Sequence, residues 1–199
     1  MPDVTEPSTH KTKRLFIAVE LPQDIREYLG AAVRTLQETG ADAKWVESKN
    51  IHLTLKFLGA TPAETIPAIR RTMTAVTDNA RAVPTSLETF GGFPSLSAPR
   101  VLWVSLTDKE KHLEHIVRGL EDSLSAVGFA KEDRPFKAHI TLARLRSSHN
   151  RLSLTEAARK FQAVLEHPAF NLDNMTLFES VLSPKGPAYS IIEQIKLNT

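Results

Sequence analysis

The chain has 199 residues, of which 41% are hydrophobic and 24% charged, a composition typical of one globular domain that buries about 70% of its unfolded surface. It contains no cysteine, which excludes disulfides and thiolate metal sites and fits a cytoplasmic protein. The formal charge of +2 demands no polyanionic partner, and no apolar run approaches the roughly 20 residues that span a bilayer.

The first elements alternate between extended and helical patterns. Residues 1–13 are mainly polar and predict a flexible tail, and residues 14–20 (RLFIAVE) predict a strand. A helix follows Pro22, because apolar residues recur at helical spacing until Gly40. A short extended segment at 44–46 then leads to a second strand.

The second strand, residues 51–58, alternates strictly between apolar and polar side chains. Successive side chains on a strand point to opposite faces, so positions i and i+2 project together. One face is expected to carry the polar side chains and the other the apolar ones: His52, Thr54 and Lys56 against Leu53, Leu55 and Phe57. The apolar face should pack on helices, which leaves the polar face open.

The same order of elements then appears again. A helix is expected from Thr61, and Gly91-Gly92-Phe93-Pro94 marks a turn region. The later segments predict a strand at 101–106, a helix at 108–128, a strand from His139 and a helix at 153–166. Two final strands are expected at 174–182 and 188–195, joined by a turn at 183–187.

A duplicated strand-helix-strand-helix unit predicts a single α+β domain over residues 14–199, with repeat halves of about 14–90 and 100–199. We expect two lobes related by an approximate two-fold axis, whose antiparallel sheets line a central groove and whose helices lie outside. No segment is long enough to act as a linker between independent domains.

One four-residue motif occurs in both halves, as His52-Leu53-Thr54-Leu55 and as His139-Ile140-Thr141-Leu142. One copy is weak evidence, whereas two copies at equivalent places of a repeat predict a shared site. An unperturbed imidazole titrates near pH 6.5, so one histidine can accept water's proton while the other protonates a departing oxygen. Threonine hydroxyls can donate to non-bridging oxygens. The pattern favours metal-free displacement at phosphorus and leaves open which histidine is the acid.

With these motifs in view, the chain resembles the 2H phosphoesterase superfamily, and within it the LigT-like RNA 2′,3′-cyclic phosphodiesterases, also called 2′-5′ RNA ligases. The resemblance rests on five segments that span most of the chain: RLFIAVELP (14–22), KWV (44–46), NIHLTLKFLG (50–59), FKAHITLAR (136–144) and SVLSPKGPAYSII (180–192). It implies a bilobal α+β fold and a monomer. It also implies hydrolysis of RNA 2′,3′-cyclic phosphate ends to 2′-phosphomonoesters, without metal or nucleotide cofactor, and reverse joining of certain RNA ends.

The resemblance also implies roles for the motif residues. His52 would donate the proton to the leaving 3′ oxygen, and His139 would accept the proton of the attacking water. Thr54 and Thr141 would hold the phosphate.

Four further side chains are candidates for substrate binding. Arg144 would clamp the phosphate through its fork of donors, although strict alternation puts it on the wrong face and its role requires a twist, a bulge or a strand end. Lys56 would supply positive potential. Phe16 would stack a nucleobase or belong to the core, and Tyr189 would contact substrate or pack under the groove.

Two other functions fit the same residues. The first is a 2H phosphodiesterase for a small nucleotide, such as a cyclic phosphate derived from ADP-ribose or 2′-5′ oligoadenylate. The second is a module that binds RNA ends with little turnover. Substrate profiling distinguishes the first, and tight end-binding without turnover would indicate the second.

Overall fold

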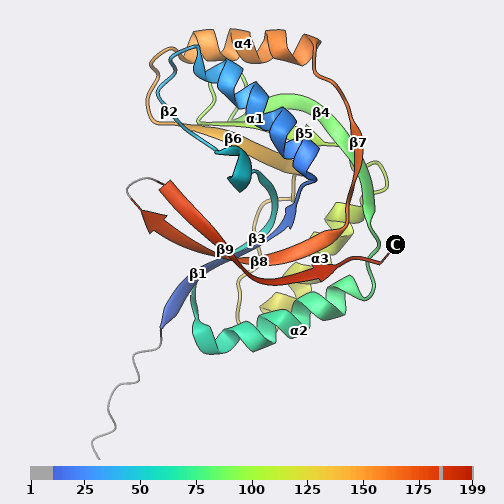
Figure 1. Ribbon diagram of the computed structural model, residues 1–199. Helices are drawn as coiled ribbons and strands as arrows, with labels where there is room; N and C mark the ends of the chain where they lie inside the picture. The colour runs from blue at the N-terminus through green and yellow to red at the C-terminus, as the bar shows by residue number, and fades with distance from the viewer. Residues whose placement is uncertain (1–10, 184–185, 199) are drawn as a thin grey trace, which may run out of the picture.

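The computed structural model describes residues 11–183 and 186–198 of the chain. Four helices surround a curled sheet (Figure 1). The strands are β1 (Thr12–Glu20), β2 (Ala43–Trp45), β3 (His52–Pro62), β4 (Val83–Phe93), β5 (Val101–Leu106), β6 (His139–Leu145), β7 (Ala169–Leu172), β8 (Asn174–Ser183) and β9 (Gly186–Lys196). The α-helices are α1 (Gln23–Gln37), α2 (Ile66–Thr77), α3 (His112–Ser125) and α4 (Arg151–Ala163), and two short 3₁₀ helices are η1 (Ser48–Asn50) and η2 (Ala63–Thr65).

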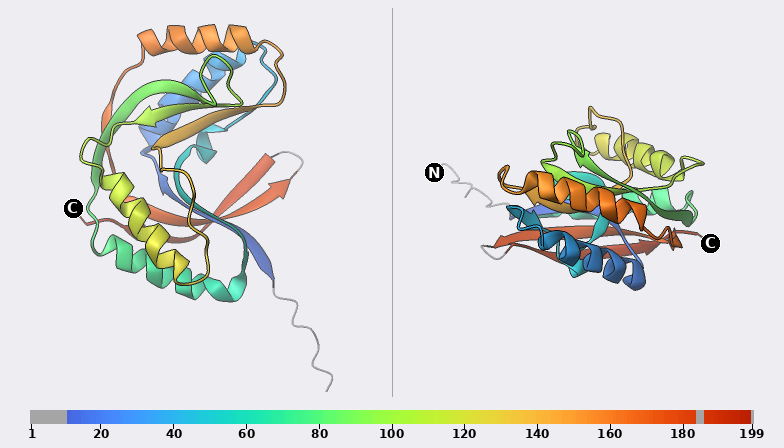
Figure 2. Two further views of the ribbon diagram at one scale, coloured as in Figure 1. Left: turned by 180° about the vertical axis from the view of Figure 1, so that it is seen from behind. Right: turned by 90° about the horizontal axis from the view of Figure 1, so that it is seen from above.

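The sheet is antiparallel, and its strands follow the order β7-β4-β5-β6-β3-β1-β8-β9, with β2 paired to β6. The two predicted sheets are therefore continuous. They join where β3 meets β6, through the single residue pair Leu53 and Ile140. Both side chains are fully buried, so the junction is anchored in the core while the sheets curl away from it on either side (Figure 2).

The strand order is symmetric about this junction, because β6, β5 and β4 on one side correspond to β3, β1 and β8 on the other. Helices from different halves of the sequence pack together: α1 against α4, and α2 against α3. Figure 1 shows the first pair above the sheet and the second pair below it. The approximate two-fold axis is present, but each lobe combines elements from both sequence repeats.

Several element boundaries differ from the sequence prediction. β1 begins at Thr12, which pairs with Pro62, so the predicted tail is too long by two residues, and residues 1–10 lie outside the described residues. β3 continues to Pro62, where the start of a helix was expected; α2 begins at Ile66, with Pro67 tolerated in its first turn. The strands β4 and β7 were not predicted.

The apolar face of α1 packs as the periodicity predicted. Ile25, Leu29, Val33 and Leu36 of α1 are all buried in one hydrophobic core. Within the described ranges, no helix combines the length and apolarity needed to cross a membrane.

Candidate active site

The two histidine motifs meet at the junction of the sheet. In the antiparallel register around Leu53 and Ile140, His52 lies opposite Thr141 and Thr54 lies opposite His139. The middle residues point into the core, so the four polar side chains share the other face. The histidine of each copy is therefore placed beside the threonine of the other copy.

Both imidazoles are oriented by a backbone carbonyl two residues earlier in the chain. Nδ1 of His52 donates to the carbonyl oxygen of Asn50 at 2.7 Å, and Nδ1 of His139 donates to that of Lys137 at 2.7 Å. These bonds fix the tautomer and leave Nε2 for other partners. In His52, Nε2 accepts from the hydroxyl of Thr54 at 3.1 Å, which is the imidazole-hydroxyl pairing that the motif predicted.

A β-bulge follows the threonine in each motif strand. Opposite β5, Thr141 pairs with Trp103 and Ala143 with Leu102, so Leu142 is the extra residue. The bulge changes the alternation, and Arg144 joins the face of His139 and Thr141. The bulge therefore explains how Arg144 reaches this face, although strict alternation places it on the opposite one.

The equivalent bulge in β3 reverses the prediction for two other residues. Ala18 pairs with Thr54 and Ile17 with Lys56, so Leu55 is extra. Lys56 is only 3% exposed, and its Nζ lies 2.8 Å from Glu121 Oε2 and 2.6 Å from the Ala130 carbonyl. The expectation that Lys56 faces the substrate is wrong, because the bulge turns it into the interior.

Phe57 takes the place on the polar face that Lys56 was expected to hold. It was predicted on the apolar face, yet its side chain is 55% exposed. By symmetry it stands where Arg144 stands in the other motif. One motif therefore presents an aromatic ring and the other presents a guanidinium.

A cavity of about 460 Å³, here called the central cavity, lies over these residues. Its lining includes His52, Thr54, Thr141 and Arg144, together with Arg14, Phe16, Phe57 and Tyr189. Such a volume suits a nucleotide-sized ligand. His139 belongs to the same group of four side chains but is not among the residues that line this cavity.

Burial lowers the pKa of both histidines from the ordinary value of 6.5, and the positive charge of Arg144 lowers both pKa values further. The hydrogen bonds to Asn50 and Lys137 act in the opposite direction. His52 is the more deeply buried of the two. Neutral imidazoles near neutral pH can accept protons, and each can donate after protonation.

Aromatic rings enclose His52. Phe16 is 4% exposed, and its ring stacks on Phe178 at 5.1 Å between centroids and lies 5.0 Å from the His52 ring. Little of the Phe16 ring surface is exposed for a nucleobase to stack on. Packing in the core is therefore favoured over base stacking for this residue. Tyr189 meets His52 edge-on at 5.4 Å and lines the central cavity, and burial raises the pKa of its phenol.

The sequence did not point to several residues of this site. Arg14 lines the central cavity, and Asn50 and Lys137 act through their carbonyl groups. Phe93 meets the His139 ring edge-on at 5.1 Å. A backbone carbonyl acceptor cannot be recognised from the type of side chain at its position. The bulge that exposes Phe57 leaves no mark in the alternating sequence pattern.

Comparisons with known proteins identify the family to which the whole chain is similar. The family model described as LigT-like phosphoesterase matches the chain twice, over residues 19–103 and 104–189. A Thermus thermophilus protein named RNA 2′,3′-cyclic phosphodiesterase is 34% identical over 92% of this chain and 90% of its own. One from Methanocaldococcus jannaschii is 29% identical over 91% of this chain and 99% of its own. The crystal structure of TT0787 from Thermus thermophilus matches with a TM-score of 0.74 and 28% identity, and the match covers 92% of this chain and 97% of that one.

Proposed function

This chain belongs to the LigT-like phosphoesterase family, and from that premise we propose that it opens 2′,3′-cyclic phosphate ends of RNA to 2′-phosphomonoesters by paired-histidine catalysis. It is an enzyme of the cyclic phosphodiesterase class, as its relatives are named. The observation that carries the proposal is the group of four side chains from both motifs, with Arg144 brought to the same face by the bulge.

In the proposed reaction, His139 accepts a proton from water as the water oxygen attacks phosphorus. The bond between phosphorus and the 3′ oxygen breaks, and His52 donates its proton to that oxygen. The product keeps its phosphate on the 2′ oxygen, and one water is consumed. His139, the less buried ring, is the better placed of the two to meet solvent water.

Thr54, Thr141 and Arg144 stabilise the charge that develops on the non-bridging oxygens. Two shared properties support this role: the three side chains line one cavity, and all three are hydrogen-bond donors. The guanidinium of Arg144 also presents a fork of donors that suits phosphate. Charge-assisted bonds of this kind strengthen as negative charge builds in the transition state. If a 5′ hydroxyl took the place of water as the nucleophile, the same proton transfers would open the ring and join the two RNA ends through a 2′-5′ phosphodiester.

The test is incubation of an oligonucleotide bearing a 2′,3′-cyclic phosphate with the purified protein in excess chelator, followed by identification of the product. Ring opening that yields only the 2′-phosphate supports the proposal. A requirement for a divalent ion, or a 3′-phosphate product, contradicts it. An ADP-ribose cyclic phosphate and 2′-5′ oligoadenylate are the comparison substrates, and tight binding without turnover would point to an end-binding module.

A further inference from the structure

A second cavity of about 470 Å³, here called the side cavity, adjoins the central one. The two cavities share Asn50, His52, Pro187 and Tyr189 in their linings. His52 therefore stands at the boundary between them. A ligand that reaches His52 has room to extend in two directions.

Arg26 of α1 lines the side cavity. Its Nε is buried, and among the described residues it has no hydrogen-bond partner. A buried donor of a charged group that lacks an acceptor is costly in the absence of a ligand. The backbone at this point is fixed, because the Ser48 hydroxyl donates to the Arg26 carbonyl at 2.9 Å.

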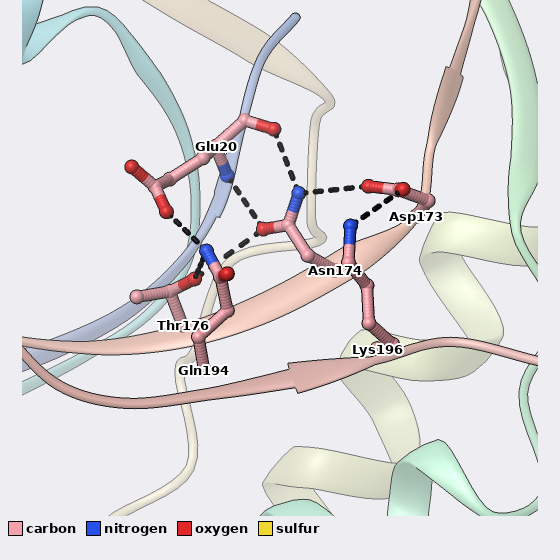
Figure 3. A network of polar contacts seen from close by, with 6 residues as sticks. All are labelled: Glu20, Asp173, Asn174, Thr176, Gln194 and Lys196. Atoms are coloured by element: carbon pink, nitrogen blue, oxygen red, sulfur yellow. Dashed lines mark hydrogen bonds and ion pairs between the residues drawn. The ribbon is translucent and has the colours of Figure 1, made fainter.

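The acidic residues of the side cavity have other partners. Glu47 Oε2 lies 2.8 Å from Lys49 Nζ. The Glu20 carboxylate accepts from the Gln194 amide, which also donates to the Thr176 hydroxyl at 3.1 Å (Figure 3). Among the described residues of this wall, Arg26 keeps one guanidinium donor, Nε, without an acceptor.

The backbone of Glu20 is hydrogen-bonded as well as its side chain. The amide side chain of Asn174 accepts from the Glu20 nitrogen at 3.0 Å and donates to the Glu20 carbonyl at 3.0 Å (Figure 3). The buried side-chain amide of Asn174 thus extends the hydrogen bonding between β1 and β8 beyond the last backbone pair of the two strands. This wall is preorganised, which favours a binding site over an incidental hollow.

The proposed reaction places the leaving 3′ oxygen at His52, so the terminal ribose lies where the two cavities meet. The exposed ring of Phe57 offers a surface for the terminal base in the central cavity. The strand continues from the 5′ oxygen of the same ribose, and the side cavity is the other direction open to it.

We propose that the side cavity receives the nucleotide that precedes the cyclic end, and that Arg26 donates to a non-bridging oxygen of the phosphodiester between the two nucleotides. This inference rests on the proposed function and deepens it. The substrate class is then an oligonucleotide of at least two residues. Arginine suits this contact because it binds phosphate oxygens through several donors at once.

The experiment compares kcat/KM for three substrates: adenosine 2′,3′-cyclic phosphate, the same nucleotide with a 5′-phosphate, and the dinucleotide ApA with a 2′,3′-cyclic phosphate end. We expect the wild-type protein to prefer the last two over the first. Arg26→Met should reduce this preference by about 10- to 100-fold, since a hydrogen bond to a charged group is lost. Arg26→Lys keeps the charge and should retain part of it.

Arg34→Met, which changes an exposed arginine of the same helix, is the matched control and should keep the wild-type preference. Melting temperatures of the Arg26 variants establish whether they are folded. If Arg26→Met and the wild-type protein share the same preference, the inference is wrong while the proposed function stands. If the wild-type protein opens none of the three rings, the proposed function itself fails. A preference for the dinucleotide but not for the 5′-phosphate would overturn the assigned phosphate contact.

Discussion

Leu55 of β3 and Leu142 of β6 are equivalent bulge residues, each directly after the threonine of its motif. The bulges decide which later side chains reach the central cavity. Lys56 turns into the interior, whereas Phe57 and Arg144 turn to the cavity. The two halves of a symmetric site thereby acquire different chemistry.

Loss of Lys56 should destabilise the protein. Lys56→Ala leaves the carboxylate of Glu121 uncompensated next to the core, and we expect a loss of about 3–5 kcal/mol in the free energy of unfolding. Lys56→Met combined with Glu121→Leu should lose less, since no unpaired charge remains. Urea denaturation measures both. A loss below about 1 kcal/mol for Lys56→Ala would mean that the pair behaves like one at the surface.

Arg144→Gln should lower kcat/KM about 10²- to 10³-fold, because one charged donor to the developing phosphate charge is removed. It should also move the pH profile of kcat/KM to higher pH, since the charge of Arg144 lowers the pKa of both His52 and His139. Arg146→Gln, at an exposed arginine two residues later, is the control. An unshifted profile would exclude an electrostatic influence of Arg144 on the histidines.

The pH profile of the wild-type enzyme gives a separate test. The histidine pair works with one ring protonated and the other neutral, so kcat/KM is largest between the two pKa values of the free enzyme. Both pKa values are lowered from 6.5. A bell-shaped profile with its maximum on the acid side of pH 6.5 is therefore expected. A maximum at alkaline pH would mean that other groups carry the protons.

Phe57→Ala should weaken substrate binding by about 1–3 kcal/mol, the range for a base stacked on an aromatic side chain. The ring is largely exposed, so the free energy of unfolding should change little. Leu152→Ala, at an exposed leucine of α4, is the control for removal of surface apolar area. Steady-state kinetics on a cyclic nucleotide provide the readout, and an unchanged KM would remove Phe57 from the substrate contacts.

Alternation along the motif strands predicted the faces of His52 and Thr54 correctly. It failed from Lys56 onwards, because a bulge shifts the pattern by one residue and nothing in Leu55 marks the shift. The family resemblance suggested a phosphate-binding role for Arg144, although strict alternation placed its side chain on the opposite face. The bulge gives the physical reason why the side chain reaches the site. Strict periodicity therefore holds only as far as the first irregular pair.

The arrangement of the lobes could not be predicted from the sequence either. The α+β class and the two-fold repeat were predicted and are confirmed by the sheet order and by the likeness to a solved structure. Which helix packs on which depends on contacts between distant segments, such as α1 with α4. The strand β4 was missed because the pair Gly91-Gly92 was interpreted as part of a turn, although both residues lie inside a paired strand.

The most direct test of the account is the rate of His52→Ala and of His139→Ala on an oligonucleotide with a 2′,3′-cyclic phosphate end. Each substitution should lower kcat about 10²- to 10⁴-fold while the protein stays folded, because each removes one proton transfer. The double variant should lose less than the product of the two factors, since the rings act as a unit. His115→Ala, at an exposed histidine of α3, should keep the wild-type rate. A near-wild-type rate in either motif variant would contradict paired-histidine catalysis.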